Sequence, residues 1–194
     1  MRTKLLGLVL AVATTLTMSA QEHFTFRGVE LNGPLSDFIT QMEAKGFVFK
    51  NNFENGNGAS MTGSFMGYSD CELYIFTTPN SKMVRMVKIY LPEEENNWSS
   101  LKSCYTQSVD AFTKKYGAPG DEYSFFSKPY YEGDGYEMTG VKADKCNYAA
   151  FWELEKGAIF IEISKWCQVC ISYEDNLNTQ LSSQEKEQNI LDEI

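Results

Sequence analysis

The feature that most constrains the fold of this chain is an order of elements that occurs twice. One predicted helix closes at Lys45-Gly46-Phe47, and a second closes at Lys115-Tyr116-Gly117. Apolar runs of strand character follow each helix, at residues 73–76 and 83–91 and at residues 159–161 and 169–173. This order predicts an α+β fold, a tandem helix-plus-antiparallel-strands repeat in which two main helices pack on antiparallel sheet.

The predicted boundaries follow from this order. Residues 21–96 form the first repeat, residues 97–177 form the second, and residues 178–194 form a polar C-terminal tail or short helix. The second repeat is longer, and its extra length is expected in residues 128–147, the stretch richest in turn residues. Two unrelated helix-plus-hairpin units that resemble each other by coincidence are the alternative.

Two helices and the strand before them can be placed by pattern. Residues 23–29 predict a first strand, in which apolar residues stand among polar ones. Pro34 then begins a helix, in which Leu35, Phe38 and Met42 share one face. A longer helical stripe is predicted from residue 97 to residue 117. In residues 178–194 a capping-box pattern predicts only a marginal surface helix or a loose tail.

The N-terminal residues 1–20 have the pattern of a signal peptide. Arg2 and Lys4 precede a short apolar stretch, and Met18-Ser19-Ala20 offers a small-residue cleavage site. The stretch is too short to span a bilayer, and no later segment is long and apolar enough to do so. The sequence therefore predicts an exported protein that does not span the membrane and is periplasmic, on the cell surface or secreted.

The charge of the chain argues against nucleic acid as a partner. It carries 17 basic and 26 acidic residues, for a formal net charge of −9. An acidic surface repels phosphate backbones, while it also keeps an exported protein soluble. Basic proteins and cations stay open as partners.

Five cysteines allow two disulfides and one remaining thiol, and the sequence leaves their pairing open: Cys71, Cys104, Cys146, Cys167 and Cys170. The last two form a C-x-x-C pattern within a predicted strand, where an offset of three places the two sulfurs on opposite faces. A redox motif would normally open a helix, and a zinc site would need a second ligand pair. Buried thiols, with one or two bridges, are the plainer interpretation.

His23 is the one histidine of the chain, which argues against Ser-His-Asp and Cys-His catalysis and against histidine-based zinc sites. Cleavage after Ala20 would place His23 third in the mature chain, a position from which a free amine, two amides and the imidazole can bind Cu(II) or Ni(II). An N-terminal Gln21 tends to cyclise and lose that amine. We therefore predict no metal site, no catalytic residue and no cofactor.

The strongest candidates for function lie in the expected loop at residues 128–147. Tyr130, Tyr131 and Tyr136 stand there among glycine and aspartate residues. Tyrosine gives a large amphipathic contact area at low ordering cost, and long loops often carry function. These three residues are the predicted binding site, although tyrosine is frequent throughout the chain and can simply cover the sheet.

Carboxylates support a second hypothesis. Glu132, Asp134 and Glu153 could serve a hydrolase, which would need two carboxylates across one cleft. Solvated surface residues are the plainer interpretation, because the spacing of Glu132, Asp134 and Glu137 lacks the full calcium-loop pattern.

Two resemblances follow from these elements. The tandem plan of a helix followed by antiparallel strands resembles the β-lactamase inhibitor protein and the small outer-membrane assembly lipoproteins, over roughly the mature chain. The chain is also similar to uncharacterised exported proteins of Bacteroides-type bacteria. The segments that carry this second resemblance are His23-Phe24-Thr25-Phe26-Arg27-Gly28-Val29 with Gly33 and Leu35, Lys45-Gly46-Phe47, Lys115-Tyr116-Gly117, Ile171-Ser172-Tyr173-Glu174-Asp175 with Asn178, and Leu191-Asp192-Glu193.

The sequence thus favours a non-enzymatic binding protein that presents a sheet face and the loop at residues 128–147 to an unknown protein or glycan partner. A carboxylate-based hydrolase is one alternative. An envelope-assembly factor is another, and it is implied only by the resemblance in element order.

Overall fold

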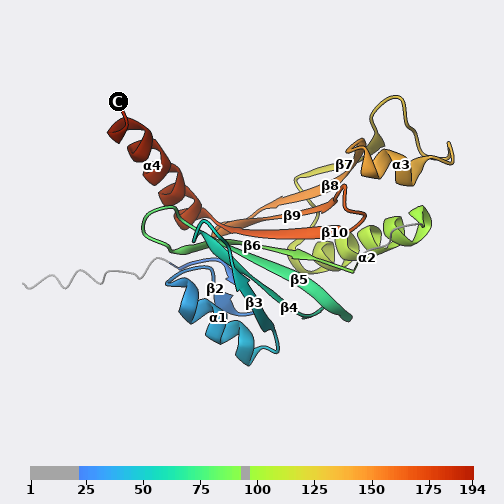
Figure 1. Ribbon diagram of the computed structural model, residues 1–194. Coiled ribbons are helices and arrows are strands. Elements are labelled where there is room, and N and C mark those ends of the chain that lie inside the picture. Colours follow the sequence, from blue (N-terminus) through green and yellow to red (C-terminus); the bar gives the residue numbers. More distant parts are fainter. Residues whose placement is uncertain (1–21, 93–96) are drawn as a thin grey trace, which may run out of the picture.

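The centre of the molecule is one antiparallel sheet of eight strands in the order β3-β4-β5-β6-β10-β9-β8-β7 (Figure 1). The structure is a computed structural model, and it describes residues 22–92 and 97–194. The predicted signal peptide, residues 1–20, lies outside the described residues. The predicted α+β class is confirmed, since a main helix and then four antiparallel strands occur twice along the chain, with the short helix α3 inserted in the second set.

Ten strands and four helices are described. The strands are β1 (Thr25–Phe26), β2 (Val29–Glu30), β3 (Val48–Asn52), β4 (Gly58–Phe65), β5 (Tyr68–Thr77), β6 (Val84–Tyr90), β7 (Asp121–Phe126), β8 (Cys146–Glu153), β9 (Gly157–Ile163) and β10 (Val169–Asp175). The helices are α1 (Leu35–Ala44), α2 (Trp98–Tyr116), α3 (Glu137–Lys142) and α4 (Asn176–Asp192).

The two predicted main helices form for the reasons that their sequences indicate. In α1, Phe38 and Met42 are buried, and Gly46 follows the helix with a φ of 90°. Asn97 caps α2, because its side chain accepts a hydrogen bond from the backbone N–H of Ser100 at 3.1 Å. Gly117 ends α2 with a φ of 87°, a left-handed conformation that glycine adopts without strain.

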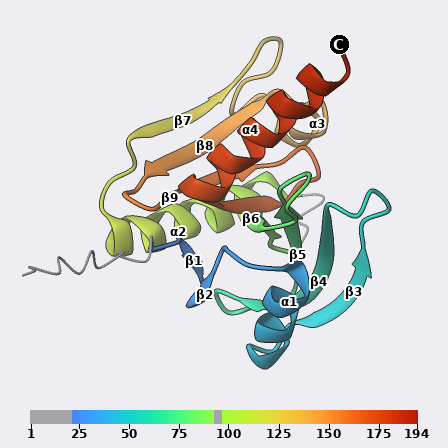
Figure 2. The same cartoon turned by 90° about the vertical axis from the view of Figure 1, so that its left-hand side faces the viewer.

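The sheet has a core face and an outer face. Alternate residues of the inner strands, such as Leu73, Ile89, Ile161 and Ile171, are fully buried on the core face. The helices α1 and α2 and the β1–β2 hairpin pack on this side, where one hydrophobic core joins them to the sheet (Figure 2). The intervening residues form the outer face, which α1 and α2 do not cover.

The cross-strand register aligns the outer face into rows. One row runs through Glu72, Tyr90, Cys170, Glu162, Ala149 and Tyr123, and the next runs through Tyr74, Lys88, Ser172, Phe160 and Phe151. These rows cross the seam between β6 and β10, where the first four strands of the sheet meet the last four. The outer face is therefore continuous across both halves of the chain.

Three sequence-based predictions need correction. The predicted strand at residues 23–29 is a hairpin, because Arg27 and Gly28 adopt φ values of 51° and 77° and turn the chain between β1 and β2. The expected loop at residues 128–147 contains the six-residue helix α3. The predicted tail or short helix at residues 178–194 is a longer surface helix, since α4 runs for 17 residues from an Asp175 cap and projects from the end of the sheet (Figure 1).

The two main helices pack against different strands on the core face. The contacts of α1 are with β2 and the edge strand β3, whereas α2 contacts the inner strands β9 and β10. None of the helices in the described ranges is long and apolar enough to span a membrane.

Candidate binding surface

The three loop tyrosines have different environments. Tyr131 and Tyr136 are each 65% exposed, whereas Tyr130 is half-buried. A Cβ atom added at Gly140 of α3 would lie 3.1 Å from Cγ of Tyr130 and 3.0 Å from Cδ1 of Phe126. Tyr130 thus packs with Phe126 over Gly140, and the structure leaves Tyr131 and Tyr136 as the exposed tips.

The loop is held in one conformation by its own carboxylates. Asp134 accepts hydrogen bonds from the backbone N–H of Tyr131 at 3.0 Å and of Tyr136 at 2.6 Å. Glu137 accepts one from the backbone N–H of Gly133 at 2.8 Å. These bonds fix the backbone at both tyrosine tips, which lowers the entropy cost of a contact made by their rings.

Glu132 fastens the loop to the body of the protein. Its carboxylate accepts hydrogen bonds from Lys102 at 2.5 Å, from the hydroxyl of Tyr148 at 2.7 Å and from the indole of Trp98 at 3.3 Å. The bonds from Lys102 and Tyr148 lower the pKa of Glu132 below its ordinary value. Glu132 therefore remains ionised and links the loop to α2 and β8.

The carboxylates proposed for hydrolysis occupy separate places. Glu132 faces α2, Asp134 bonds to the loop backbone, and Glu153 is an exposed residue of β8 opposite Ala158. General acid–base chemistry on one bond needs two carboxyl groups across one cleft. The structure does not bring these three side chains together in such an arrangement.

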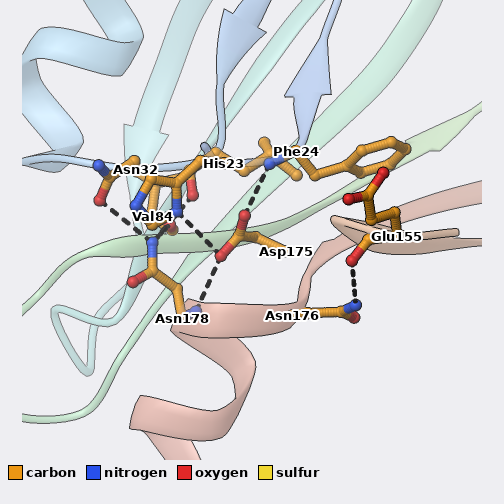
Figure 3. A network of polar contacts seen from close by, with 9 residues as sticks. His23, Phe24, Asn32, Val84, Glu155, Asp175, Asn176 and Asn178 are labelled. Atoms are coloured by element: carbon orange, nitrogen blue, oxygen red, sulfur yellow. Dashed lines mark hydrogen bonds and ion pairs between the residues drawn. The ribbon is translucent and has the colours of Figure 1, made fainter. Parts of the chain in front are cut away.

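His23 belongs to a buried polar network at the N-terminal side of α4 (Figure 3). Its Nδ1 lies 3.1 Å from Oδ1 of Asp175, a fully buried side chain. Asp175 also accepts hydrogen bonds from the backbone N–H of Phe24 at 2.7 Å and of Asn178 at 2.8 Å. The side chain of Asn178 then donates to the carbonyl oxygens of Leu31 and Val84, each at 2.9 Å.

This network gives His23 a structural role in the fold. Gln21, the first residue of the copper motif considered above, lies outside the described residues. Across the described part of the chain, no group of three or more His, Cys, Asp or Glu side chains is placed to hold a metal ion.

Four of the five cysteines are buried, and Cys146 is partly buried. Burial raises the pKa of Cys146 to about 12 and the pKa of Cys170 to about 11. A thiol with such a pKa stays protonated at neutral pH and is a poor nucleophile. Cys167 lies in the turn before β10, whereas Cys170 lies within that strand on the outer face.

The outer face carries several large aromatic side chains that are not part of the core. Tyr74 and Tyr90 make an edge-to-face contact with ring centroids 5.6 Å apart. Tyr123 is 52% exposed and Phe125 is 51% exposed, both on the edge strand β7, and Trp166 in the turn between β9 and β10 is 63% exposed. Aromatic rings thus extend across the outer face from β5 to β7.

Two adjoining depressions lie among these rings. One, of about 460 Å³, is lined by Glu72, Tyr74, Phe76, Tyr90, Trp166 and Gln168. The other, of about 600 Å³, extends from Tyr90 and Trp166 to Tyr123 and Phe125. Because Tyr90 and Trp166 line both, the two depressions form a continuous uneven surface.

Charged groups are set into this aromatic surface. Burial raises the pKa of Glu162, and the nearby Lys88 partly offsets that effect. At another point of the face, Arg85 lies 4.0 Å from Glu174. A surface with aromatic rings and few, partly desolvated charges has the composition of a recognition surface.

The sequence predicted that a sheet face takes part in binding, but it named only the loop tyrosines and none of the aromatic residues on the outer face. The signal was present, because Glu72, Tyr74 and Phe76 alternate with Cys71, Leu73 and Ile75. Alternation alone shows two faces without telling which one a helix covers. The fold and this surface define an α+β protein with an aromatic sheet face that α1 and α2 do not cover. Searches of family models, curated proteins and solved structures find no match to the chain.

Proposed function

We propose that this protein is an exported, non-enzymatic binding protein that engages a protein or glycan partner through the outer face of its sheet. The observation that carries the proposal is the set of exposed aromatic side chains on a sheet face that neither main helix covers. Tyr123, Phe125 and Trp166 stand there at one-half exposure or more.

The physical argument rests on the cost of this arrangement. Exposed aromatic rings forgo the stabilisation that their burial would give, which for a Phe side chain is about 1.5–3 kcal/mol. Large exposed apolar patches are uncommon on monomeric proteins and mark interaction sites. Aromatic rings with a polar edge suit both protein surfaces and the mixed surface of a sugar, which supports either class of partner.

The loop tips form a second contact element. Tyr131 and Tyr136 project from a backbone that Asp134 and Glu137 hold in place. The outer face and the tips are thus two distinct surfaces, and substitutions can test them separately.

The test is affinity capture from the native envelope with the mature protein as bait, followed by mass spectrometry. One variant removes rings from the outer face (Tyr123→Ser with Trp166→Ser), and another removes the loop tips (Tyr131→Ser with Tyr136→Ser). A matched control replaces two exposed apolar residues of α4, Ile190 and Leu191, which are 63% and 54% exposed.

We expect wild type and the α4 control to enrich the same partner, and the outer-face variant to lose it. A weaker loss in the loop variant would assign the tips an auxiliary role. Equal enrichment by the outer-face variant and wild type would refute the outer face as the binding surface.

A further inference from the structure

A separate pocket lies on the core-face side of the sheet, away from the outer face. It has a volume of about 380 Å³ and lies between the β1–β2 hairpin, the turn from β4 to β5, the C-terminal half of α2, and β10. We call it the hairpin pocket, and the residues that define it here are Arg27, Phe65, Phe112, Lys115, Tyr116 and Tyr173. Pockets that take small organic ligands begin at about 300 Å³, so its size suits a small molecule.

Aromatic rings form the wall of the hairpin pocket. The ring centroid of Phe112 lies 5.8 Å from that of Tyr116 and 6.0 Å from that of Tyr173. Phe65 continues this wall from the β4–β5 turn. Such a wall favours an apolar ligand body through burial of its surface.

Two cations complete the lining. Arg27 donates through Nη1 to the carbonyl oxygen of Ser64 at 2.9 Å and lies over the ring of Phe47, with Cζ 5.6 Å from its centroid. Its guanidinium has further N–H donors beyond the one used on Ser64. Lys115 lies over the ring of Tyr116, with Nζ 4.8 Å from the centroid.

The charge of the pocket lining is opposite in sign to the net charge of the chain. The formal net charge is −9, yet the described residues that line the pocket include two cations and no carboxylate. Charge complementarity therefore selects an anionic group, and the aromatic wall selects an apolar body beside it.

We propose that the hairpin pocket binds a small amphipathic anion, an apolar molecule with a single carboxylate. Its apolar body would lie along Phe65, Phe112 and Tyr173, and its carboxylate would face Arg27 and Lys115. This site is independent of the proposed binding function, because it lies on the opposite side of the sheet and shares no residue with the outer-face depressions described above.

Isothermal titration calorimetry of the mature protein with octanoate tests the proposal, with 1-octanol as a neutral ligand of the same chain length. We expect saturable binding of octanoate and weaker binding of octanol. Arg27→Gln and Lys115→Gln should each weaken octanoate binding about fivefold, the effect of roughly 1 kcal/mol for an exposed ion pair.

Lys114→Gln is the matched control, because Lys114 is an exposed cation one residue from Lys115 that does not line the pocket. It should leave octanoate affinity unchanged. In addition, Ala111→Trp should block binding by filling the pocket, since Ala111 is an exposed residue of its lining. The thermal midpoint of every variant is measured alongside, so that a folding defect is recognised.

Four results would overturn the proposal. The first is no saturable octanoate binding to wild type, and the second is equal affinity for octanol and octanoate. The third is binding only to vesicles of anionic phospholipid, which would assign the two cations to a membrane surface instead of a small-molecule site. A loss in Lys114→Gln as large as that in Lys115→Gln would likewise exclude a localised anion site.

Discussion

Among single residues, Glu132 shows how a side chain from a loop can stabilise the whole loop. Three donors from α2 and β8 converge on its carboxylate. Its side chain is 43% exposed and that of Lys102 is 40% exposed, so solvent screens the ion pair and keeps its contribution small. The neutral donors Trp98 and Tyr148 add specificity to the attachment, because their positions are fixed within an aromatic cluster.

Glu132→Gln should lower the free energy of unfolding at pH 7 by at most about 1 kcal/mol, because the pair is partly exposed. The folded-state pKa of Glu132 is lowered from 4.5, so its stabilising effect is present above pH 4.5 and is lost as pH falls through the folded pKa. Urea denaturation of both proteins from pH 7 to pH 3 checks this. A stability difference that grows on acidification would contradict the prediction.

Gly157→Ala tests a close approach between the N-terminal segment and the start of β9. A Cβ atom at this position would lie 2.2 Å from the carbonyl oxygen of Glu174 and 2.6 Å from Cγ of Phe24. Because one of these neighbours is backbone, the substitution should cost about 2 kcal/mol or more of unfolding free energy.

The matched control is Gly120→Ala, whose Cβ atom would meet only the carbonyl oxygen of Phe151, at 3.9 Å. Its effect should stay within about 0.5 kcal/mol. Equal urea midpoints for the two variants would show that the segment around Phe24 can move to accommodate the Cβ atom without loss of unfolding free energy.

Exposure of single side chains was the least predictable property of the sequence. Tyr130 and Tyr131 are neighbours in one loop, yet Tyr130 packs over Gly140 while Tyr131 is exposed. What separates them is the path of α3, a helix of six residues that carries too few apolar positions to mark a face. Trp166 went unnoticed for a similar reason, since its exposure depends on the turn between β9 and β10.

At the scale of elements, α4 is held by polar contacts along its N-terminal and middle turns and by few apolar contacts. Asp175 caps its first turn, and Asn178 and Ser182 are its buried residues. Further along, Glu185 accepts hydrogen bonds from the backbone N–H groups of Asn80, at 2.7 Å, and Ser81, at 3.1 Å. Polar anchors of this kind hold a helix whose apolar stripe is thin.

Asp175→Ala should destabilise the protein by about 2–4 kcal/mol, since it removes a helix cap and leaves the partly buried N–H of Phe24 without its acceptor. Asp175→Asn should cost less, because the amide oxygen can still accept one of these bonds. Circular dichroism during urea unfolding measures both. The control is Asp192→Ala, at the exposed far end of α4, which should leave the midpoint unchanged.

The long elements were predictable from the sequence, and the physical reason is periodicity. The helix α2 shows a helical stripe and two end signals, and the β5–β6 hairpin shows two apolar runs around a turn. The β1–β2 hairpin lacks this redundancy, because each of its strands has two residues and the turn at Arg27 requires a positive φ in a residue other than glycine. The helix α4 starts at Asn176, before the predicted tail at residue 178, because Asp175 at the end of β10 caps it.

For the molecule as a whole, the strand order has a symmetry that bears on the proposed repeat. Read outward from the β6–β10 seam, the order is β6-β5-β4-β3 on one side and β10-β9-β8-β7 on the other. That correspondence favours a duplicated unit. The different packing positions of α1 and α2 weigh against close structural equivalence of the two halves, since α1 lies at the sheet edge and α2 lies over inner strands. Duplication therefore stays a proposal.

The two halves are also interlocked across the seam. The strand β1, from the N-terminal half, contacts β10, and α4, from the C-terminal end, contacts β6. At the seam itself, Ile89 pairs with Ile171 and Val87 pairs with Tyr173, and the four side chains are buried in one core. A half isolated from its neighbour would expose an apolar sheet edge and lose an element that covers it.

We therefore predict that residues 22–92 and residues 97–194, each produced alone, lack a cooperative thermal transition, whereas the two fragments produced together regain one. The cause is the shared core, because neither half retains enough buried apolar surface to offset its conformational entropy. Differential scanning calorimetry and near-UV circular dichroism measure the transition. The same pair carrying Ile89→Asp is the control and should not reassemble, because the substitution places an unpaired charge in the seam. A sharp transition in either fragment by itself would mean that the repeats are autonomous domains, and the continuous outer face would then be a product of their docking.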